Sequence, residues 1–509
     1  MCVVSFLKFF FGGKGMINDK LKKAREYEVR KEKEIAPDKR PAFHLTPRVG
    51  WMNDPNGFSY HNGEYHMFYQ YHPYDTSWGP MHWGHAVSKD LLKWESRPAA
   101  LAPDESYDDF GCFSGSAASL DDGRQLLLYT GVQNAKDENG KEIVFQTQCV
   151  AVGDGTNFEK YEKNPVLTAD DLPEGASKID FRDPKIWKEK DGTFRCVVGS
   201  RPADGSGQIL LYSSKDGFSW NFEQILIQNK NRFGKMWECP DFFELDGKWL
   251  LMVSPQDMLP VGLEYGAGNG TLCVAGHLDE NEHFVEEDTQ SIDYGIDFYA
   301  PQTVLSPDGR RIMIGWMQNW DTCSVREDEM KWFGQTSCPR ELHFVDGKLI
   351  QTPIRELSNY RKNTVTYSEV LVSDCVSLEN VAGRVADLEI ELKPENSEDM
   401  YDKFVIQFAK NEKFHSELVF NPKESLLEID RTYSGVRRAA QHQKKCKVAD
   451  QNGSIKLRVI LDRYSVEVFV NDGEQAMSME LFTEQEANQI HFSADGKVKM
   501  NLTKSDLEF

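Results

Sequence analysis

The sequence of 509 residues lacks any apolar run as long as the roughly 18 residues that a membrane-spanning helix needs. Its one apolar stretch near the start, residues 2–11, is broken by Lys8 and lacks the basic leading region and small-residue cleavage site of a secretory signal. Basic residues are fewer than acidic ones, because the sequence has 59 Lys and Arg and 81 Asp and Glu, which gives a net charge of −22. Such a surface argues against binding nucleic acid or anionic membranes. We therefore predict a cytoplasmic protein with a neutral substrate.

Metal-binding patterns are also missing. The ten cysteines include no Cys-x-x-Cys pair, so we interpret them as buried free thiols in a reducing compartment. Five histidines crowd one segment, but their spacing is irregular and no cysteine or carboxylate completes a set of zinc ligands. These histidines are His61, His66, His72, His82 and His85. We predict no metal and no cofactor.

The first 40 residues form an N-terminal extension. Residues 12–15 read Gly-Gly-Lys-Gly, and their codons must be purine-rich, like a bacterial ribosome-binding site. We hypothesise that translation starts at Met16 and that residues 1–15 are a mis-assigned leader. Residues 17–40 are charged and periodic, which predicts a lead-in helix that ends near Pro37.

Residues 41–352 have all-β texture, because short apolar and aromatic runs alternate with turns. Five motifs at spacings of roughly 55–70 residues each open a strand, and Asp-Gly or Asn-Gly turns follow them. They are Asp54-Pro55, Ser114-Gly115, Asp183-Pro184, Glu238-Cys239-Pro240 and Tyr299-Ala300-Pro301. Five such units predict a five-bladed β-propeller with about four strands per blade.

The remaining sequence predicts a second domain. Residues 353–364 resemble a short linker helix, and residues 365–509 alternate cleanly between apolar and polar positions. This alternation is typical of an antiparallel β-sandwich. The overall prediction is an all-β chain, a five-bladed propeller followed by a sandwich. The sandwich also offers a surface on which two copies could form a homodimer.

Three carboxylates occupy equivalent places in three of the repeats: Asp54, Asp183 and Glu238. The first strand of each propeller blade lines the central axis, so we expect these side chains to converge although they are far apart in sequence. Aromatic neighbours accompany them, which suits the faces of sugars, and paired carboxyls are the groups that hydrolyse glycosidic bonds.

Eight sequence strings, three of which contain these carboxylates, make the resemblance to a family specific. The chain resembles glycoside hydrolase family 32, which contains invertases, sucrose-6-phosphate hydrolases, inulinases and levanases. The resemblance covers residues 41–509. The matching strings are Trp-Met-Asn-Asp-Pro-Asn-Gly (51–57), Phe-Tyr-Gln-Tyr-His-Pro (68–73), Trp-Gly-His-Ala-Val-Ser (83–88), Phe-Ser-Gly-Ser (113–116), Phe-Arg-Asp-Pro (181–184), Trp-Glu-Cys-Pro-Asp (237–241) and Pro-Arg-Glu-Leu (339–342), with Ser-Val-Glu-Val-Phe-Val-Asn-Asp-Gly (465–473) near the end.

The resemblance implies a retaining reaction on β-fructofuranosides without a metal. By motif match, Asp54 would be the nucleophile, Glu238 the general acid and then base, and Asp183 the stabiliser of the transition state. Substrate contacts carry over to a further set. These are Asn53, Gln70, Trp78, Phe113, Ser114, Arg182 and Trp320, with Trp316 as the alternative to Trp320.

The chemistry sets two physical requirements. Asp54 must be ionised to attack, whereas Glu238 must hold a proton near neutral pH and therefore needs a raised pKa. A covalent intermediate also requires the two carboxyl groups to lie roughly 5–5.5 Å apart, and a separation near 8 Å would favour inversion. Cys239 lacks an evident histidine partner, so we interpret it as pocket lining.

Several functions stay open at this point. Close alternatives are hydrolysis of inulin or levan and fructosyl transfer on the same site. A second alternative is an inverting propeller enzyme that acts on arabinans or xylans, and a third is a fructoside-binding homologue without catalysis. The leaving group is equally open between sucrose, sucrose-6-phosphate and short fructooligosaccharides. A phosphate would need basic side chains at the rim, for which the candidates are Arg232, Lys235 and Lys331.

Overall fold

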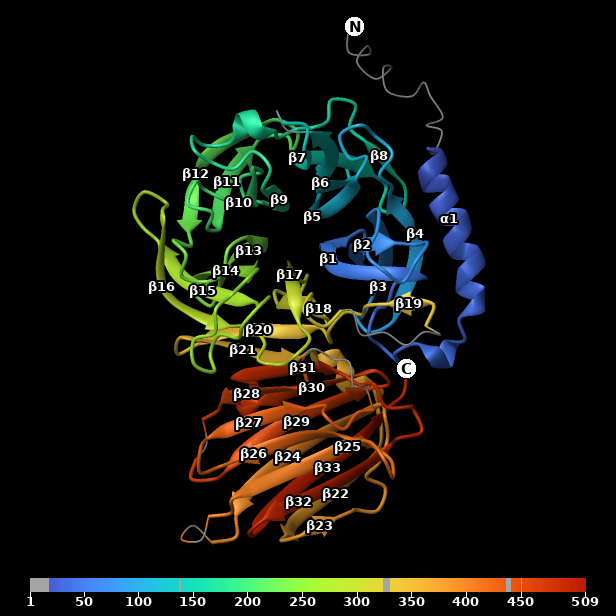
Figure 1. Cartoon of the computed structure of the whole chain (residues 1–509), viewed down its shortest axis with the longest axis vertical. Helices are drawn as coiled ribbons and strands as arrows, with labels where there is room; N and C mark the ends of the chain where they lie inside the picture. The colour runs from blue at the N-terminus through green and yellow to red at the C-terminus, as the bar shows by residue number, and fades with distance from the viewer. Residues whose placement is uncertain are drawn as a thin grey trace, which may run out of the picture.

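The structure is a computed structural model of the chain, and it describes residues 18–136, 139–323, 330–396, 398, 400–435, 441–449 and 451–509. The hypothesis about Met16 lies outside these residues. Strands dominate two domains that are stacked along the long axis of the molecule (Figure 1). In the described part of the chain no helix is both long and apolar enough to cross a bilayer.

The first domain is a ring of five sheets, each with its lowest-numbered strand toward the centre (Figure 1). Blade 1 contains β1 (Gly50–His61), β2 (Glu64–His72), β3 (His82–Ser88), β4 (Trp94–Leu101) and β19 (Trp332–Phe333). Blade 2 contains β5 (Gly111–Ser119), β6 (Gln125–Lys136), β7 (Glu142–Gly153) and β8 (Phe158–Lys160). Blade 3 contains β9 (Phe181–Lys188), β10 (Phe194–Ser200), β11 (Gln208–Ser214) and β12 (Trp220–Gln228).

Two more blades complete the ring. Blade 4 contains β13 (Trp237–Leu245), β14 (Lys248–Pro255), β15 (Leu272–Leu278) and β16 (Phe284–Ser291). Blade 5 contains β17 (Tyr299–Leu305), β18 (Arg311–Trp316), β20 (Arg340–Val345) and β21 (Lys348–Pro353). Between β18 and β20 the chain crosses to blade 1, where β19 pairs in parallel with the start of β1. This crossing joins the last blade to the first.

Every innermost strand is irregular near its start. The pairing register shifts between Met52 and Pro55 in β1, between Phe113 and Gly115 in β5, and at the matching points of β9, β13 and β17. Such bulges bend a strand and change the direction of its side chains. The five sequence motifs therefore mark five bulges around one axis.

The second domain is a sandwich of two six-stranded sheets. One sheet has the order β22 (Arg361–Val372), β33 (Val498–Leu507), β24 (Ala386–Pro394), β29 (Ile455–Asp462), β30 (Ser465–Val470) and β31 (Gln475–Glu480). The other has the order β23 (Cys375–Val376), β32 (Gln489–Asp495), β25 (Lys403–Lys410), β26 (Ser416–Asn421), β27 (Leu426–Asp430) and β28 (Gln443–Lys447). The predicted fold class, a five-bladed propeller followed by a β-sandwich, is confirmed.

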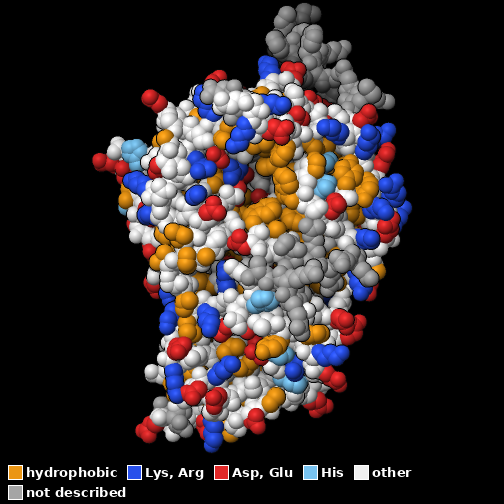
Figure 2. All heavy atoms as spheres, in the orientation of Figure 1, with side chains coloured by type: hydrophobic (Ala, Val, Ile, Leu, Met, Phe, Trp, Pro, Cys, Tyr) orange, Lys and Arg blue, Asp and Glu red, His pale blue; other side chains and the backbone are white. Residues whose placement is uncertain are grey.

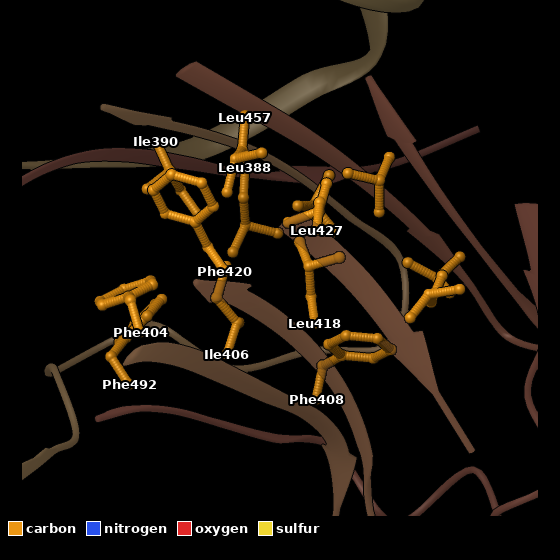
Figure 3. Packing of buried hydrophobic residues seen from close by; sticks show 14 of the residues in the cluster. Leu388, Ile390, Phe404, Ile406, Phe408, Leu418, Phe420, Leu427, Leu457 and Phe492 are labelled. Carbon is orange, nitrogen blue, oxygen red and sulfur yellow. The ribbon is translucent and has the colours of Figure 1, made fainter. Parts of the chain in front are cut away.

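Alternation along these strands builds the core of the sandwich. Leu388 and Ile390 on one sheet face Phe404, Ile406 and neighbouring apolar side chains on the other (Figure 3). All four are about 1% exposed, so the two sheets exclude water between them. Burial of this kind supplies the main stabilising free energy of such a domain.

Buried charges join the two domains. Arg340 of blade 5 donates from Nη2 to Glu467 Oε2 of the sandwich at 2.7 Å and to Asp293 Oδ2 at 2.9 Å. His44, just before blade 1, lies 2.8 Å from Asp462 Oδ2 and 3.1 Å from Glu467 Oε1. The segments 339–342 and 465–473, which contain Arg340 and Glu467, therefore contribute an ion pair that connects the two domains.

Helices are few and short in the residues that the structure describes. Helix α1 (Asp19–Lys31) packs on β4, and the other helical turns are the 3-10 helices η1 (Glu32–Glu34), η2 (Pro37–Lys39), η3 (Ala169–Asp171), η4 (Arg355–Tyr360) and η5 (Asn471–Gly473). The segment between the domains is thus the six-residue η4, followed at once by β22.

Candidate active site

Asp54 lies in the bulge of β1 and receives hydrogen bonds on both carboxylate oxygens. Ser114 Oγ of blade 2 donates to Oδ2 at 2.6 Å, and Asn53 Nδ2 donates to Oδ1 at 3.0 Å. Trp51 Nε1 in turn donates to Asn53 Oδ1 at 2.7 Å, which fixes the orientation of that amide. Burial raises the pKa of Asp54, and the hydrogen bond from Ser114 opposes this by stabilising the charged form.

Cys239 brings two of the three carboxylates together. Its backbone N–H donates to Asp183 Oδ2 at 3.0 Å, and its thiol lies 3.5 Å from Asp54 Oδ2 and 3.7 Å from Asp183 Oδ2. Asp183 and Cys239 both have positive φ angles, 64° and 49°, which are strained for residues other than glycine. The chain accepts this strain at the two bulges that point these side chains inward.

Glu238 stands beside the same cluster and is held by two other blades. Arg182 of blade 3 donates to Oε1 from Nη2 at 2.9 Å and from Nε at 3.1 Å. The hydroxyl of Tyr299, in blade 5, lies 2.7 Å from Oε2. These contacts fix the position of the Glu238 carboxyl group between blades 3 and 5.

Asp183 also has a raised pKa. Burial and the negative charge of Glu238 together raise its pKa to about 7, against the opposing charge of Arg182. The carboxyl groups of Asp54, Asp183 and Glu238 thus lie close together, with the guanidinium of Arg182 bonded to Glu238. Their mutual repulsion favours the retention of one proton among them near neutral pH.

Aromatic side chains wall the site. Trp51 stacks on Phe333 and Trp320, with ring centroids 4.7 Å and 6.1 Å apart. On another side Trp78 meets the edge of Phe113 at 6.0 Å and is 41% exposed, so its ring is open to a ligand. Figure 2 shows a hollow over the centre of the propeller with hydrophobic side chains along its rim.

The remaining predicted contacts differ in their positions. Gln70, on β2, is buried, and its Nε2 donates to the carbonyl oxygen of Cys112, next to Phe113, at 3.0 Å. Trp316 is fully buried behind Trp51, whereas Trp320 is partly exposed. Of the two tryptophans, Trp320 therefore has the surface that could close a pocket.

Two residues at the site did not figure among the predicted contacts. Tyr299 contacts Glu238, and Gln302 donates from Nε2 to the Gly115 carbonyl oxygen at 3.0 Å, beside Ser114. The sequence did indicate Tyr299 by its position in the repeat, because it lies near the start of the innermost strand of blade 5, as Asp54 does in blade 1. Gln302 carried no comparable signal.

The basic candidates for a phosphate site lie on the surface of the propeller. Arg232 forms two hydrogen bonds with Glu286, at 2.8 and 2.7 Å, on the outside of blade 4. Lys235 and Lys331 are exposed. Within the described residues no group of three His, Cys, Asp or Glu side chains is arranged to hold a metal ion.

Comparisons with known proteins agree on one family. A model described as the Glycosyl hydrolases family 32 N-terminal domain matches residues 44–353, and one described as Glycosyl hydrolases family 32 C terminal matches residues 356–507. A raffinose invertase of Escherichia coli is 39% identical over 89% of this chain and 92% of its own length. A sucrose-6-phosphate hydrolase of the same species is 37% identical over 89% and 91%.

Solved structures give the same result. A variant of the GH32 beta-fructofuranosidase of Bombyx mori, in complex with sucrose, superimposes with a TM-score of 0.81. It is 34% identical in sequence, and the match covers 96% of this chain and 98% of that one.

Proposed function

The chain belongs to glycoside hydrolase family 32, and from this premise we propose that its three carboxylates carry out retaining hydrolysis of β-fructofuranosides. The chain is a β-fructofuranosidase, a glycosidase acting on sucrose-type substrates. The observation that carries the residue assignment is the cluster in which Asp54 and Asp183 both contact Cys239 while Glu238 adjoins it. Three blades thereby supply one carboxyl each to one small volume.

The first step is attack by Asp54 on the anomeric carbon of the fructosyl unit. Donors on both of its oxygens, Ser114 and Asn53, favour the ionised form that attack requires. Glu238 protonates the leaving oxygen, so the proton that the site retains must lie on Glu238 in the substrate complex. Asp183 accepts hydrogen bonds from the fructosyl hydroxyls and stabilises the positive charge that develops on the ring.

The second step releases fructose. Glu238, now deprotonated, removes a proton from water, which attacks the covalent fructosyl ester on Asp54. Arg182 and Tyr299 stabilise the charged Glu238 at this stage. Retention requires the two carboxyl groups to lie roughly 5–5.5 Å apart, and NMR of the first sugar anomer released reports the outcome directly.

The test of these roles is Glu238→Gln beside Glu244→Gln, which changes an exposed residue of the same strand. We expect Glu238→Gln to lower kcat on sucrose by roughly 10²–10⁴-fold, as loss of general acid–base catalysis does, while sucrose still binds. Glu244→Gln should retain wild-type turnover. Unchanged turnover of the Glu238 variant would end the assignment.

The leaving group is a finer question, for which we propose sucrose or a short fructooligosaccharide. Support comes from Arg232, whose charge is already paired with Glu286. The measurement is kcat/KM on sucrose, sucrose-6-phosphate and 1-kestose. A preference for the phosphate of more than about tenfold, or ~1.4 kcal/mol, would require a phosphate contact from Lys235 or Lys331. Fructan hydrolysis or fructosyl transfer on the same site would appear as activity on long chains or as transfer products.

Two properties of the whole molecule are also proposed. Buried thiols such as Cys112, Cys149 and Cys196 are free, which fits a reducing, cytoplasmic location. A homodimer formed through the sandwich is to be tested by light scattering coupled to size-exclusion chromatography. Cell fractionation tests the location.

A further inference from the structure

A second cavity lies where blade 4 of the propeller meets the sandwich. It measures about 170 Å³ and is lined by the loop of residues 256–271, by residues after β16 and by Lys444 of β28. None of the three site carboxylates lines it. Pockets for drug-sized ligands measure about 300–1,000 Å³, so this one has room for a ligand no larger than a single sugar ring.

The cavity is formed by a fixed loop. Met258 and Gly268 exchange backbone hydrogen bonds of 2.7 and 3.0 Å, and Val261 and Tyr265 exchange a second pair nearer the tip. The loop is fastened to blade 4 by Tyr265, whose hydroxyl donates to the Thr289 carbonyl oxygen at 2.5 Å. A cavity fixed in advance costs little ordering free energy when it binds a ligand.

Lys444 brings a cation into this cavity. In the part of the chain that the structure describes, no carboxylate oxygen lies within 4.0 Å of its ammonium group, although Lys445 beside it pairs with Glu428. Its nitrogen lies close to Gly266, on the cavity wall, where a Cβ atom would be 3.3 Å away. Burial lowers the pKa of Lys444, and the charges of Asp293 and Asp321 oppose this effect. A partly buried cation without a close partner is costly, and a ligand that bonds to it recovers that cost.

The other lining groups limit what the ligand can be. Two acidic residues, Glu264 and Asp293, and two basic residues, Lys444 and Lys445, line the cavity, so their formal charges cancel and favour neither an anion nor a cation. Donor and acceptor groups stand together with the rings of Tyr265 and Tyr294, and apolar Leu263 lies at the mouth with 42% exposure. Mixed hydrogen-bonding groups beside an aromatic face match a neutral polyhydroxylated ring.

We propose that this cavity binds one sugar unit, as a second carbohydrate site separate from the carboxylate cluster. It goes beyond the proposed function because binding here uses neither Asp54, Asp183 nor Glu238. The sugar can be a free monosaccharide or a distal unit of a longer substrate.

The cavity is connected to the wall of the active site. Asn269 lines the cavity, and its carbonyl oxygen accepts from Asn319 Nδ2 at 2.8 Å. Its backbone N–H donates to Asp321 Oδ2 at 3.0 Å. Asn319 and Asp321 flank Trp320, which stacks on Trp51 beside Asp54. A sugar in the cavity therefore braces the segment that carries an active-site ring.

The experiment measures sugar binding by calorimetry on the full chain. The probes are fructose and glucose on the wild-type protein, and sucrose and 1-kestose on Asp54→Asn. We expect two sites per chain for at least one free sugar, or a gain in 1-kestose affinity over sucrose. Lys444→Leu should abolish the second site or remove that gain, with about tenfold weaker binding, equal to 1.4 kcal/mol. Gly266→Val, which fills the cavity beside Lys444, should do the same.

The matched control is Lys447→Leu on the same strand, whose ammonium bonds to the Glu424 carbonyl oxygen outside the cavity. It should bind as the parent protein does. A second site for free sugar identifies a monosaccharide ligand, and a selective loss of 1-kestose affinity identifies a distal substrate unit. A single site per chain, with all affinities unchanged in both cavity variants, would overturn the proposal. Hydrolysis of sucrose by Asp54→Asn would instead contradict the proposed nucleophile and leave the free-sugar measurements valid.

Discussion

Ser114 donates the shortest hydrogen bond that Asp54 receives, 2.6 Å from Oγ to Oδ2, across the boundary between blades 2 and 1. The same oxygen of Asp54 lies 3.5 Å from the thiol of Cys239. The proposed nucleophile is thus oriented by neighbours from two other blades. Its reactivity depends on how well the propeller holds those blades in place.

Ser114→Ala removes that hydrogen bond and leaves Asp54 less stabilised as an anion. A hydrogen bond to a charged group contributes about 1.5–3 kcal/mol, so we expect kcat/KM on sucrose to fall roughly 10- to 150-fold. The pH below which activity declines should shift upward, because the pKa of Asp54 rises when a donor is lost. Ser119→Ala, at the exposed end of the same strand, is the control and should keep the wild-type profile.

Gln302→Ala tests whether a residue without substrate contact positions Ser114. Gln302 Nε2 holds the Gly115 carbonyl oxygen and Asn56 Oδ1 accepts from the Gly115 N–H, so the peptide after Ser114 is fixed from both sides. We expect kcat/KM to fall about tenfold in the wild type, and much less when Ser114 is already alanine, since the two changes act through one contact. Equal losses in both backgrounds would exclude the positioning role.

The regular spacing of the five motifs explains how much of the fold and of the site could be predicted from the sequence. Asp54, Ser114, Asp183 and Glu238 each lie near the start of the innermost strand of a blade. Because the blades are arranged in a ring, residues at the same position of their innermost strands lie close together around the axis. This relation predicted the fold class and the convergence without any long-range information. The bulges and positive φ angles that aim Asp183 and Cys239 could not be predicted, because they depend on pairing with neighbouring strands.

Charged partners were equally hidden in the sequence. Arg340 and Glu467 both lie in family-like strings, yet 127 residues separate them and nothing in either string indicates the other. The same holds for Tyr299 and Glu238. The family resemblance assigned the general acid to Glu238, which requires a raised pKa there, whereas the folded cluster raises the pKa of Asp54 and Asp183. Which carboxyl keeps the proton depends on Arg182, whose contact requires the folded ring.

Glu28 of helix α1 should make the stability of the propeller depend on pH. Burial raises its pKa to about 7, and the hydrogen bond from the Ala99 N–H opposes this. Because the folded pKa exceeds the usual value, the folded chain binds the proton more tightly, and stability falls as pH rises from about 4.5 through 7. In Glu28→Gln this decline should be smaller between pH 5 and 8, as urea unfolding measures. An identical pH slope in both proteins would contradict the prediction.

His44 should give the same direction of pH dependence at the domain interface, over a higher pH range. Burial disfavours its charged form, but Asp462 and Glu467 outweigh burial and raise its pKa to about 9. The stabilising contribution is complete below the usual pKa near 6.5 and is lost as pH rises through 9. At 1.36 kcal/mol per pKa unit it amounts to about 3 kcal/mol.

The measurement is urea unfolding of His44→Gln at pH 6, 7.5 and 9.5. The variant should be less stable than the wild type at pH 6, and the difference should shrink by pH 9.5. His343→Gln, on an exposed strand position of blade 5, should show no such convergence. A constant difference across this range would mean that His44 stabilises the fold as a neutral ring.

Removing Arg340 should destabilise the domain interface, because buried carboxylates would then lose a cationic partner that water cannot replace. Its guanidinium is fully buried and contacts Glu467 and Asp293, whose side chains are each 1% exposed. Loss of one partner of a buried ion pair costs about 3–5 kcal/mol. We expect Arg340→Met to lose that much unfolding free energy, and Arg340→Met combined with Glu467→Leu to lose less than the sum of the single changes. Asp293 still lacks its partner in the double variant, so recovery should be incomplete. Since neither side chain touches the carboxylate cluster, kcat/KM on sucrose at 25 °C should stay near the wild-type value in whatever fraction remains folded. Additive losses would show that the domains are held by apolar packing and that the ion pair is independent of it.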